Sequence, residues 1–168
     1  NFSSYNYLGL NGDAAVNHAA KEAIDLYGTS VSASRIVSGE RPIHRELETE
    51  LADFTATEEA LVFVSGHGTN VSVIPDLVGP GDIIFLDAQC HNSSQIGTTV
   101  SGARRLTFPH NDWQALDRML TQHRSAAKRA LILIEGVYSM AGDVPDLPSF
   151  IMLKKRHDAM LMVDEAHS

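Results

Sequence analysis

The sequence contains a single cysteine among 168 residues, Cys90, which excludes a disulfide within the chain and leaves no thiol pair for a redox or zinc site. Its uninterrupted apolar runs are only a few residues long, far short of the ~20 residues that a membrane-spanning helix needs. The eight histidines form no His-Glu-x-x-His pattern, so we predict no metal site. The Gly-x-Ser-x-Gly motif is also missing, which argues against a serine hydrolase. The lone cysteine is typical of a reducing compartment, and we expect the protein in the cytoplasm.

Basic residues are also scarce, because 13 Lys and Arg stand against 21 Asp and Glu and give a formal net charge of −8. Such a balance predicts repulsion from nucleic acid and from anionic membranes unless a local basic patch overrides it. The longest basic stretch, Lys154–Arg156, lies in an amphipathic segment and is interpreted as a solvated helix face. We therefore expect neither a nucleic-acid partner nor a membrane span.

Short apolar runs alternate with helical patterns along most of the chain. The runs predict strands at residues 60–64, 83–86, 105–108, 131–134 and 160–163, and helices between them at residues 67–78, 92–100, 112–123 and 148–157. Continuously apolar strands indicate burial on both faces, which is typical of a parallel sheet. The sequence therefore predicts an α/β fold with a mostly parallel sheet flanked by helices.

Two further helical patterns precede this region, at residues 14–27 and 42–54. The segment between them, residues 28–40, is rich in serine and glycine and carries Arg35 among hydroxyl groups. It is long for a simple connection between two helices, and loops of this kind often line sites.

Polar side chains follow the predicted strands at the points where ligands bind in open parallel sheets. They are Ser65 to Asn70, Asp87 and His91, His110 to Asp112, Glu135 and Ser139, and Asp164 and His167. Because the carboxyl ends of parallel strands lie at one edge, we expect these residues to share a rim.

Each of these groups also has a purely structural interpretation. The glycines of Ser65–Gly68 permit close approach of a phosphate to a helix N-terminus, but a tight turn explains them equally well. Asp164 is placed to attract a cationic ligand group, or to cap a helix. His91 could stack on a planar ligand or act as an acid or base, although a single loop histidine is more often structural.

Taken together, the motifs resemble the α-oxoamine synthases, a family of enzymes dependent on pyridoxal 5'-phosphate (PLP). Within that family they are similar to serine palmitoyltransferase-like and 8-amino-7-oxononanoate synthase-like members. The matching stretches are residues 1–10, Ser34–Gly39 with His44 and Leu47–Glu48, Ser65–Asn70, His91–Ser93, His110–Asp112, Glu135–Asp143 and Val163–Ser168. The resemblance implies that residues 1–56 form an N-terminal arm with helices, and residues 57–168 a partial large domain of a fold-type I PLP-dependent transferase.

The resemblance also implies roles for single residues. Asp164 would pair with the protonated pyridine nitrogen of PLP, His91 would stack on its ring, and His167 would bond its phenolic oxygen. The remaining cofactor-binding residues would be Ser65, Gly66 and His67 around the phosphate, and Glu135 and Ser139 in the pocket wall. Asn6 and Arg35 would contact substrate. We predict His91, Asp164 and His167 as the catalytic residues.

The implied activity is the decarboxylating condensation of a small amino acid with an acyl-CoA or acyl-carrier-protein thioester, in a homodimer. The family's covalent lysine would follow the Asp164–Ser168 segment, so we expect this chain to be an incomplete and inactive part of a longer enzyme. Two alternatives stay open: a non-catalytic partner subunit of such a synthase, and another enzyme of the same fold such as an aminotransferase. Two departures from the family pattern affect substrate recognition: His67 replaces a common Tyr or Phe, and the segment before Arg35 is rich in Ser and Ala rather than Gly.

Overall fold

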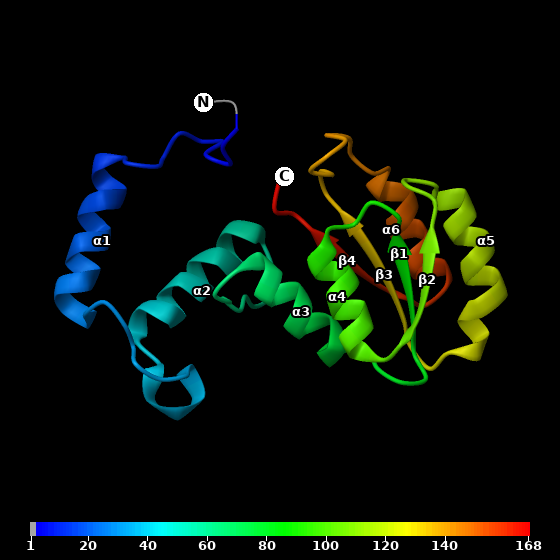
Figure 1. Cartoon of the computed structure of the whole chain (residues 1–168), viewed down its shortest axis with the longest axis horizontal. Helices are drawn as coiled ribbons and strands as arrows, with labels where there is room; N and C mark the ends of the chain where they lie inside the picture. Colours follow the sequence, from blue (N-terminus) through cyan, green and yellow to red (C-terminus); the bar gives the residue numbers. More distant parts are fainter. Residues whose placement is uncertain (1–2) are drawn as a thin grey trace. The chain divides into compact units, whose positions relative to one another are not determined.

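The computed structural model describes residues 3–168, and the first two residues of the predicted N-terminal arm, Asn1 and Phe2, lie outside the described part. The chain divides into two compact units, Asn1–Val62 and Phe63–Ser168 (Figure 1). Among the described residues, no helix combines the length and the apolar character that crossing a membrane requires.

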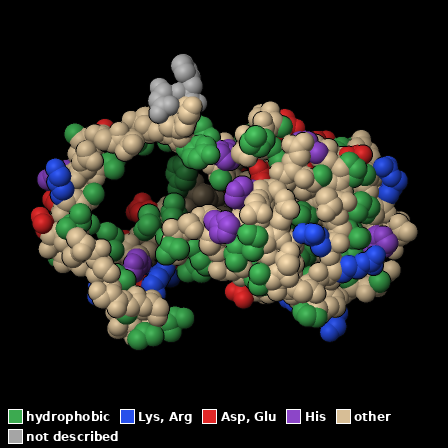
Figure 2. Space-filling model, viewed as in Figure 1, with side chains coloured by type: hydrophobic (Ala, Val, Ile, Leu, Met, Phe, Trp, Pro, Cys, Tyr) green, Lys and Arg blue, Asp and Glu red, His purple; other side chains and the backbone are tan. Residues whose placement is uncertain are grey.

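The N-terminal unit contains α1 (Ala14–Tyr27), a short π-helical turn η1 (Arg35–Gly39) and α2 (Pro42–Thr55), close to the predicted helices. Asp13 caps α1, since its carboxylate accepts the N–H groups of Ala15 at 2.9 Å and Val16 at 3.3 Å. No residue of α1 is buried, and apolar side chains are exposed along this unit (Figure 2).

The second unit is built on four parallel strands in the order β2-β1-β3-β4. They are β1 (Ile83–Asp87), β2 (Arg104–Phe108), β3 (Ala130–Glu135) and β4 (Met160–Asp164). This arrangement confirms the predicted parallel α/β fold. The register pairs Asp87 with Phe108 and Glu135 with Asp164, so the carboxyl ends of neighbouring strands lie side by side.

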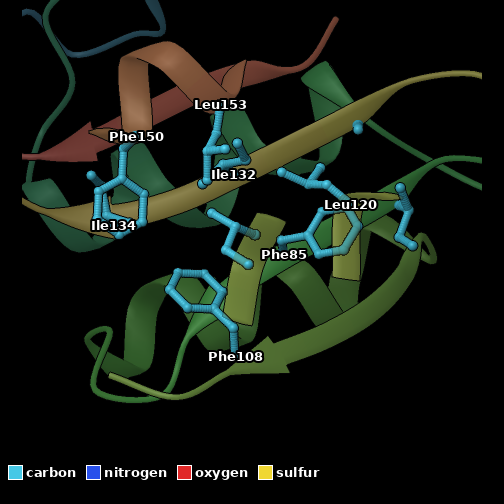
Figure 3. Close-up of a cluster of buried hydrophobic side chains, with 10 residues drawn as sticks. Phe85, Phe108, Leu120, Ile132, Ile134, Phe150 and Leu153 are labelled. Carbon is cyan, nitrogen blue, oxygen red and sulfur yellow. The ribbon is translucent and has the colours of Figure 1, made fainter. Parts of the chain in front are cut away.

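Helices cover both faces of this sheet (Figure 1). They are α3 (Gly66–Leu77), α4 (Asn92–Ser101), α5 (Trp113–His123) and α6 (Leu147–Arg156), with a 3-10 turn η2 (Arg124–Ala126) after α5. On one face Phe85 and Ile132 pack against Leu120 of α5 and Phe150 and Leu153 of α6 (Figure 3). On the other face, Ile74 of α3 and strand residues such as Ile84 and Leu133 form a second buried cluster.

One predicted strand is wrong: residues 60–64 form no strand in the structure. Leu61 and Val64 are largely exposed, and the segment has no ladder partner among residues 3–168. A strand needs a neighbour for its backbone hydrogen bonds, and apolar composition cannot supply one.

The prediction that the strands are buried on both faces is correct for only some of them. It holds throughout β1 and β3, whereas β2 exposes Arg104, Arg105 and Thr107 at the sheet edge and β4 is half-buried.

Helices α3 and α4 approach each other closely at Gly97 of α4. A Cβ atom at this position would lie 2.6 Å from the carbonyl oxygen of Asn70 and 2.8 Å from Cδ1 of Ile74. Both distances are shorter than van der Waals contact, so only glycine fits without movement. The close approach lets the Asn70 side chain reach Ser93 on α4.

We predict that Gly97→Ala lowers the free energy of unfolding by about 1–3 kcal/mol, because the added methyl group must push α3 away from α4. Urea unfolding monitored by circular dichroism measures the change. Gly79→Ala is the matched control, since a Cβ there would have only an ordinary contact at 3.7 Å with the Ser101 carbonyl oxygen. Equal stability of the two variants would contradict the prediction.

Candidate active site

A cavity with about 420 Å³ of empty space, partly open to solvent, lies at the carboxyl ends of β3 and β4. The structure brings most of the predicted site residues together here. The lining consists of Gly66, His67, His91, Ser93, Glu135, Ser139, Asp164, Ala166 and His167. Ser65 precedes this group as the N-cap of α3. The cavity is therefore assembled entirely from the second unit.

Asp164 ends β4 beside the cavity, with its two carboxylate oxygens held by different partners. Oδ1 accepts the N–H of Ala166 at 3.1 Å, which closes a local turn, and Oδ2 accepts Nδ2 of Asn70 at 2.8 Å. One oxygen thus has the structural role that the sequence left open. The other is oriented by a buried amide, which fixes the plane of the carboxylate at the cavity.

Asn70 and Ser93 connect Asp164 to His91. Nδ2 of Asn70, which is 4% exposed, also donates to Oγ of Ser93 at 2.9 Å, and that hydroxyl lies 2.7 Å from Nδ1 of His91. The N–H of Ser93 also donates to this Nδ1, at 3.2 Å. Because Nδ1 accepts, the proton of a neutral His91 ring belongs on Nε2.

The sequence places Asn70 only among the polar residues of the rim, without a role, and it gives Ser93 no place in the site. One signal was present in the sequence, since Asn70 lies four residues after Gly66 and therefore on the same helix face as a residue predicted to line the site. Recognising that Asn70 bonds Ser93 required the actual separation of α3 and α4.

The N-terminus of α3 supplies backbone donors to the cavity. Oγ of Ser65 accepts the N–H of Gly68 at 3.0 Å, which caps the helix. The first-turn N–H groups of Gly66 and His67 have no partner within a helix, and both residues line the cavity. Together with the helix dipole, such groups favour an anion such as phosphate.

Glu135 gives the cavity a second carboxylate. It is buried at the end of β3, accepts the N–H of His91, and also accepts the N–H of Ser139. Burial raises the pKa of Glu135, the hydrogen bonds lower it, and the nearby Asp164 raises it further, with a net increase. Two carboxyl groups at one cavity favour a ligand with a cationic group.

The three cavity histidines differ in their surroundings. The rings of His67 and His91 meet edge to face with centroids 6.4 Å apart, and His91 is tied to Ser93. His167 lies in the turn after Asp164 and lines the same cavity. In the part of the chain that the structure describes, no three His, Cys, Asp or Glu side chains gather as metal ligands.

The two predicted substrate-binding residues, Asn6 and Arg35, belong to the N-terminal unit and are not among the residues that line the cavity. Oδ1 of Asn6 accepts the N–H of Asn11 at 3.2 Å. The Arg35 guanidinium bonds both Glu40 and Glu48, with Nη2 at 2.9 Å and 3.0 Å from their carboxylate oxygens. Within this unit Arg35 therefore ties η1 to α2, and its contact with substrate stays a prediction.

The ion pair between Arg35 and Glu48 predicts that the stability of the N-terminal unit falls in acid. Hydrogen bonds from Arg35 and then from the Val62 N–H lower the pKa of Glu48 from 4.5 to about 2. A lowered pKa in the folded state adds stability above pH 4.5, and this stability is lost as the pH falls toward 2. We expect Glu48→Gln to lose this pH-dependent part of the stability.

The thermal unfolding midpoint of the chain, followed by the helical circular dichroism signal between pH 2 and pH 7, tests this expectation. Glu46→Gln is the matched control, because Glu46 lies exposed on the same helix. A Glu48→Gln variant with the same pH profile as the unchanged chain would contradict the assignment.

We also predict that Asn70→Leu lowers the free energy of unfolding by about 1–3 kcal/mol, because it leaves a carboxylate oxygen of Asp164 and the Ser93 hydroxyl without their shared donor. The urea midpoint measures the loss. Asn17→Leu on the exposed face of α1 is the control, and we expect it to change stability by less than about 0.5 kcal/mol. A neutral Asn70→Leu would show that the amide bonds are dispensable.

Comparison with known proteins gives a consistent result along the whole chain. Residues 1–168 match the aminotransferase class I and II family. The chain is 49% identical over 164 residues to 8-amino-7-oxononanoate synthase of Geobacter sulfurreducens, which covers 98% of this chain and 42% of that protein. The synthase of Trichlorobacter lovleyi is 47% identical, with 99% and 42% coverage. This chain therefore spans well under half the length of these curated relatives.

Solved structures agree with the observed fold. A serine palmitoyltransferase K265A variant from S. paucimobilis, with bound PLP-myriocin aldimine, matches with a TM-score of 0.94 and 38% identity, over 98% of this chain and 42% of that one. An 8-amino-7-oxononanoate synthase from Francisella tularensis matches with a TM-score of 0.78 and 26% identity, over 99% and 45% of the two chains.

Proposed function

This chain belongs to the aminotransferase class I and II family, and we propose that it forms part of a PLP-dependent α-oxoamine synthase, which condenses an amino acid with an acyl thioester and releases carbon dioxide. The relatives named above support this activity. The observation that carries the proposal is the Asp164 carboxylate, held by Asn70 at a cavity that also contains His91 and the N-terminus of α3.

The donors and acceptors of the cavity fit the polar groups of PLP. The first-turn N–H groups of Gly66 and His67 would hold the phosphate, with Ser65 fixing the start of α3. Asp164 would hold the pyridine nitrogen, and His167 the phenolic oxygen. When bound, PLP supplies an electron sink that stabilises negative charge at the α-carbon of an amino acid.

In this proposal Asp164 keeps a proton on the pyridine nitrogen. The carboxylate cannot rotate freely, because Ala166 and Asn70 hold its two oxygens. A fixed negative charge in a partly buried site raises the pKa of a cationic partner more than a mobile, solvated one. Asp164 thus favours the positively charged form of the ring.

His91 presents a flat ring whose Nδ1 is occupied by Ser93. The free Nε2–H is then available as a donor, and the ring face is available to stack on a planar ligand. Glu135 holds the backbone at His91 by accepting its N–H, and Ser139 also lines the cavity. We assign orientation of the ligand to His91.

We propose that the cavity lacks the lysine that would bind PLP covalently. The exposed or half-buried Lys154 and Lys155 lie on α6, and neither is among the residues that line the cavity. The resemblance places the covalent lysine after the Asp164–Ser168 segment, so we propose that the 168 residues alone are inactive. A small amino acid and an acyl-CoA or acyl-carrier-protein thioester would be the substrates, with a homodimer in the cytoplasm as the working form.

We predict that Asp164→Asn weakens PLP binding by the full-length gene product at least tenfold, because the amide cannot neutralise the pyridinium charge. Titration of PLP followed by absorbance and by protein fluorescence gives the dissociation constant. Asp158→Asn is the matched control, since Asp158 is fully exposed just before β4, whereas Asp164 ends that strand at the cavity. Equal affinity of both variants would refute the role of Asp164.

The same preparation separates the alternative activities. An α-oxoamine synthase releases carbon dioxide only when an amino acid and an acyl thioester are both present, and carbon-14 from a carboxyl-labelled amino acid measures this release. An aminotransferase would instead pass the amino group to a keto acid without decarboxylation. Failure to bind PLP at all would favour the non-catalytic partner subunit.

A further inference from the structure

A second group of ionisable side chains lies at the same edge of the sheet, among residues that do not line the cavity. Nδ1 of His110 is 2.8 Å from Oδ1 of Asp87, which ends β1, and Nε2 is 2.9 Å from Oδ2 of Asp143 in the loop after β3. The Asp87 side chain is fully buried, that of His110 is 19% exposed, and that of Asp143 is 44% exposed. Both ring nitrogens of His110 therefore face a carboxylate.

This geometry selects the charged form of the ring. A neutral imidazole can donate only one hydrogen bond, whereas imidazolium donates from both nitrogens. Burial of the ring opposes the charge, but the bonds to Asp87 and Asp143 outweigh it and raise the pKa of His110. Two uncharged groups also pack around the ring: the ring of Tyr138 meets it edge to face with centroids 4.4 Å apart, and the Asn111 amide lies 3.5 Å from Nε2.

The loop that carries Asp143 also forms one wall of the cavity. The Tyr138 N–H donates to the Asp143 carbonyl at 3.0 Å, and the Gly142 N–H donates to the Tyr138 carbonyl at 2.7 Å, so backbone hydrogen bonds close this loop into a turn. Ser139 follows Tyr138 and lines the cavity, as does Glu135 at the start of the loop. His110 thus contacts this loop at Asp143 and Tyr138, and the loop residue Ser139, next to Tyr138, lines the cavity.

Asn111 reinforces the same connection. Its N–H donates to Oδ2 of Asp87 at 2.8 Å, and its side-chain Nδ2 donates to Oδ2 of Asp143 at 2.7 Å. Asn111 adopts the left-handed conformation, with φ of 55°, which few side chains tolerate. The backbone after β2 is therefore shaped so that two successive residues bridge Asp87 and Asp143.

We propose that His110 is a positioning residue: by bonding Asp87 and Asp143 together, it holds the Glu135–Asp143 loop so that Ser139 and Glu135 keep their places in the cavity. The inference that this sets cofactor affinity rests on the function proposed above. The positioning itself concerns only the loop and can be measured without any cofactor.

Amide hydrogen exchange tests the positioning directly. We expect His110→Gln to raise the rate of amide exchange at residues 136–143 at least tenfold over the unchanged protein, because glutamine is uncharged and has one donor nitrogen in place of two separate ring nitrogens. His157→Gln is the matched control: Nε2 of His157 lies 2.7 Å from Asp117 in a pair between α5 and α6, away from this loop. Unchanged exchange at residues 136–143 in His110→Gln would overturn the proposal.

Asp143→Asn gives an independent test that leaves the buried Asp87 intact. It removes one of the two charges facing His110, so NMR titration of the His110 ring should show its midpoint moving to lower pH. A raised pKa stabilises the charged bridge below the ordinary histidine pKa, and this stabilisation is lost as the pH rises through the raised value. The protection factors of the loop amides should fall over the pH range in which the ring titrates, and over a lower pH range in Asp143→Asn.

The PLP affinity of the full-length gene product then tests whether the position of the loop affects the cavity. We expect about tenfold weaker binding in His110→Gln, and in the unchanged protein a loss of affinity over the pH range in which His110 titrates. His110→Gln should lack that pH-dependent step. If His110→Gln raises the rate of amide exchange in the loop but the unchanged protein does not bind PLP, the positioning role of His110 is supported and the proposed function is refuted. If the affinity and its pH profile are the same in His110→Gln, the link to the cavity is refuted.

Discussion

The parallel register of the sheet is the constraint on which the site depends. Because β3 and β4 pair with Glu135 opposite Asp164, two carboxylates end at the same level, and β1 brings Asp87 to that edge as well. Buried apolar side chains on both faces hold β1 and β3 between the two helix layers, and the backbone ladders to their neighbours set the register. The same alignment of strands therefore builds both the core and the site. The helix layers packed on the sheet stabilise the fold, and the residues at and after the strand ends form the site.

Hydrogen bonds from neutral groups then give the charged groups their orientation. Asn70 fixes Asp164 and reaches Ser93, which in turn fixes the tautomer of His91, and the contact is possible because Gly97 allows α3 and α4 to approach. The loop that carries Ser139 is held instead by charged groups, since His110 joins Asp87 to Asp143. Buried polar groups of this kind are costly unless every partner is present, which is why their loss should be felt at the cavity and in stability alike.

Periodicity and strand-end position predicted the four strands, the flanking helices and most of the cavity residues, because parallel strands place their carboxyl ends together whatever the details of packing. The same reasoning made residues 60–64 a strand, since an apolar run does not reveal whether a ladder partner is present. It placed Asn70 at the rim but could not predict its bond to Ser93, which depends on the distance between two helices. The family resemblance placed Arg35 at the substrate, and its bonds to Glu40 and Glu48 could not be predicted from spacing.

We propose that the fixed Asp164 carboxylate holds a proton on the ring nitrogen of PLP in this cavity. Nitrogen-15 NMR of PLP labelled at the pyridine nitrogen, bound to the full-length gene product, tests it most directly. We expect the chemical shift of a protonated pyridine at neutral pH, and a return toward the unprotonated value in Asp164→Asn. An unprotonated nitrogen in the unchanged protein, or the same shift in both proteins, would contradict it.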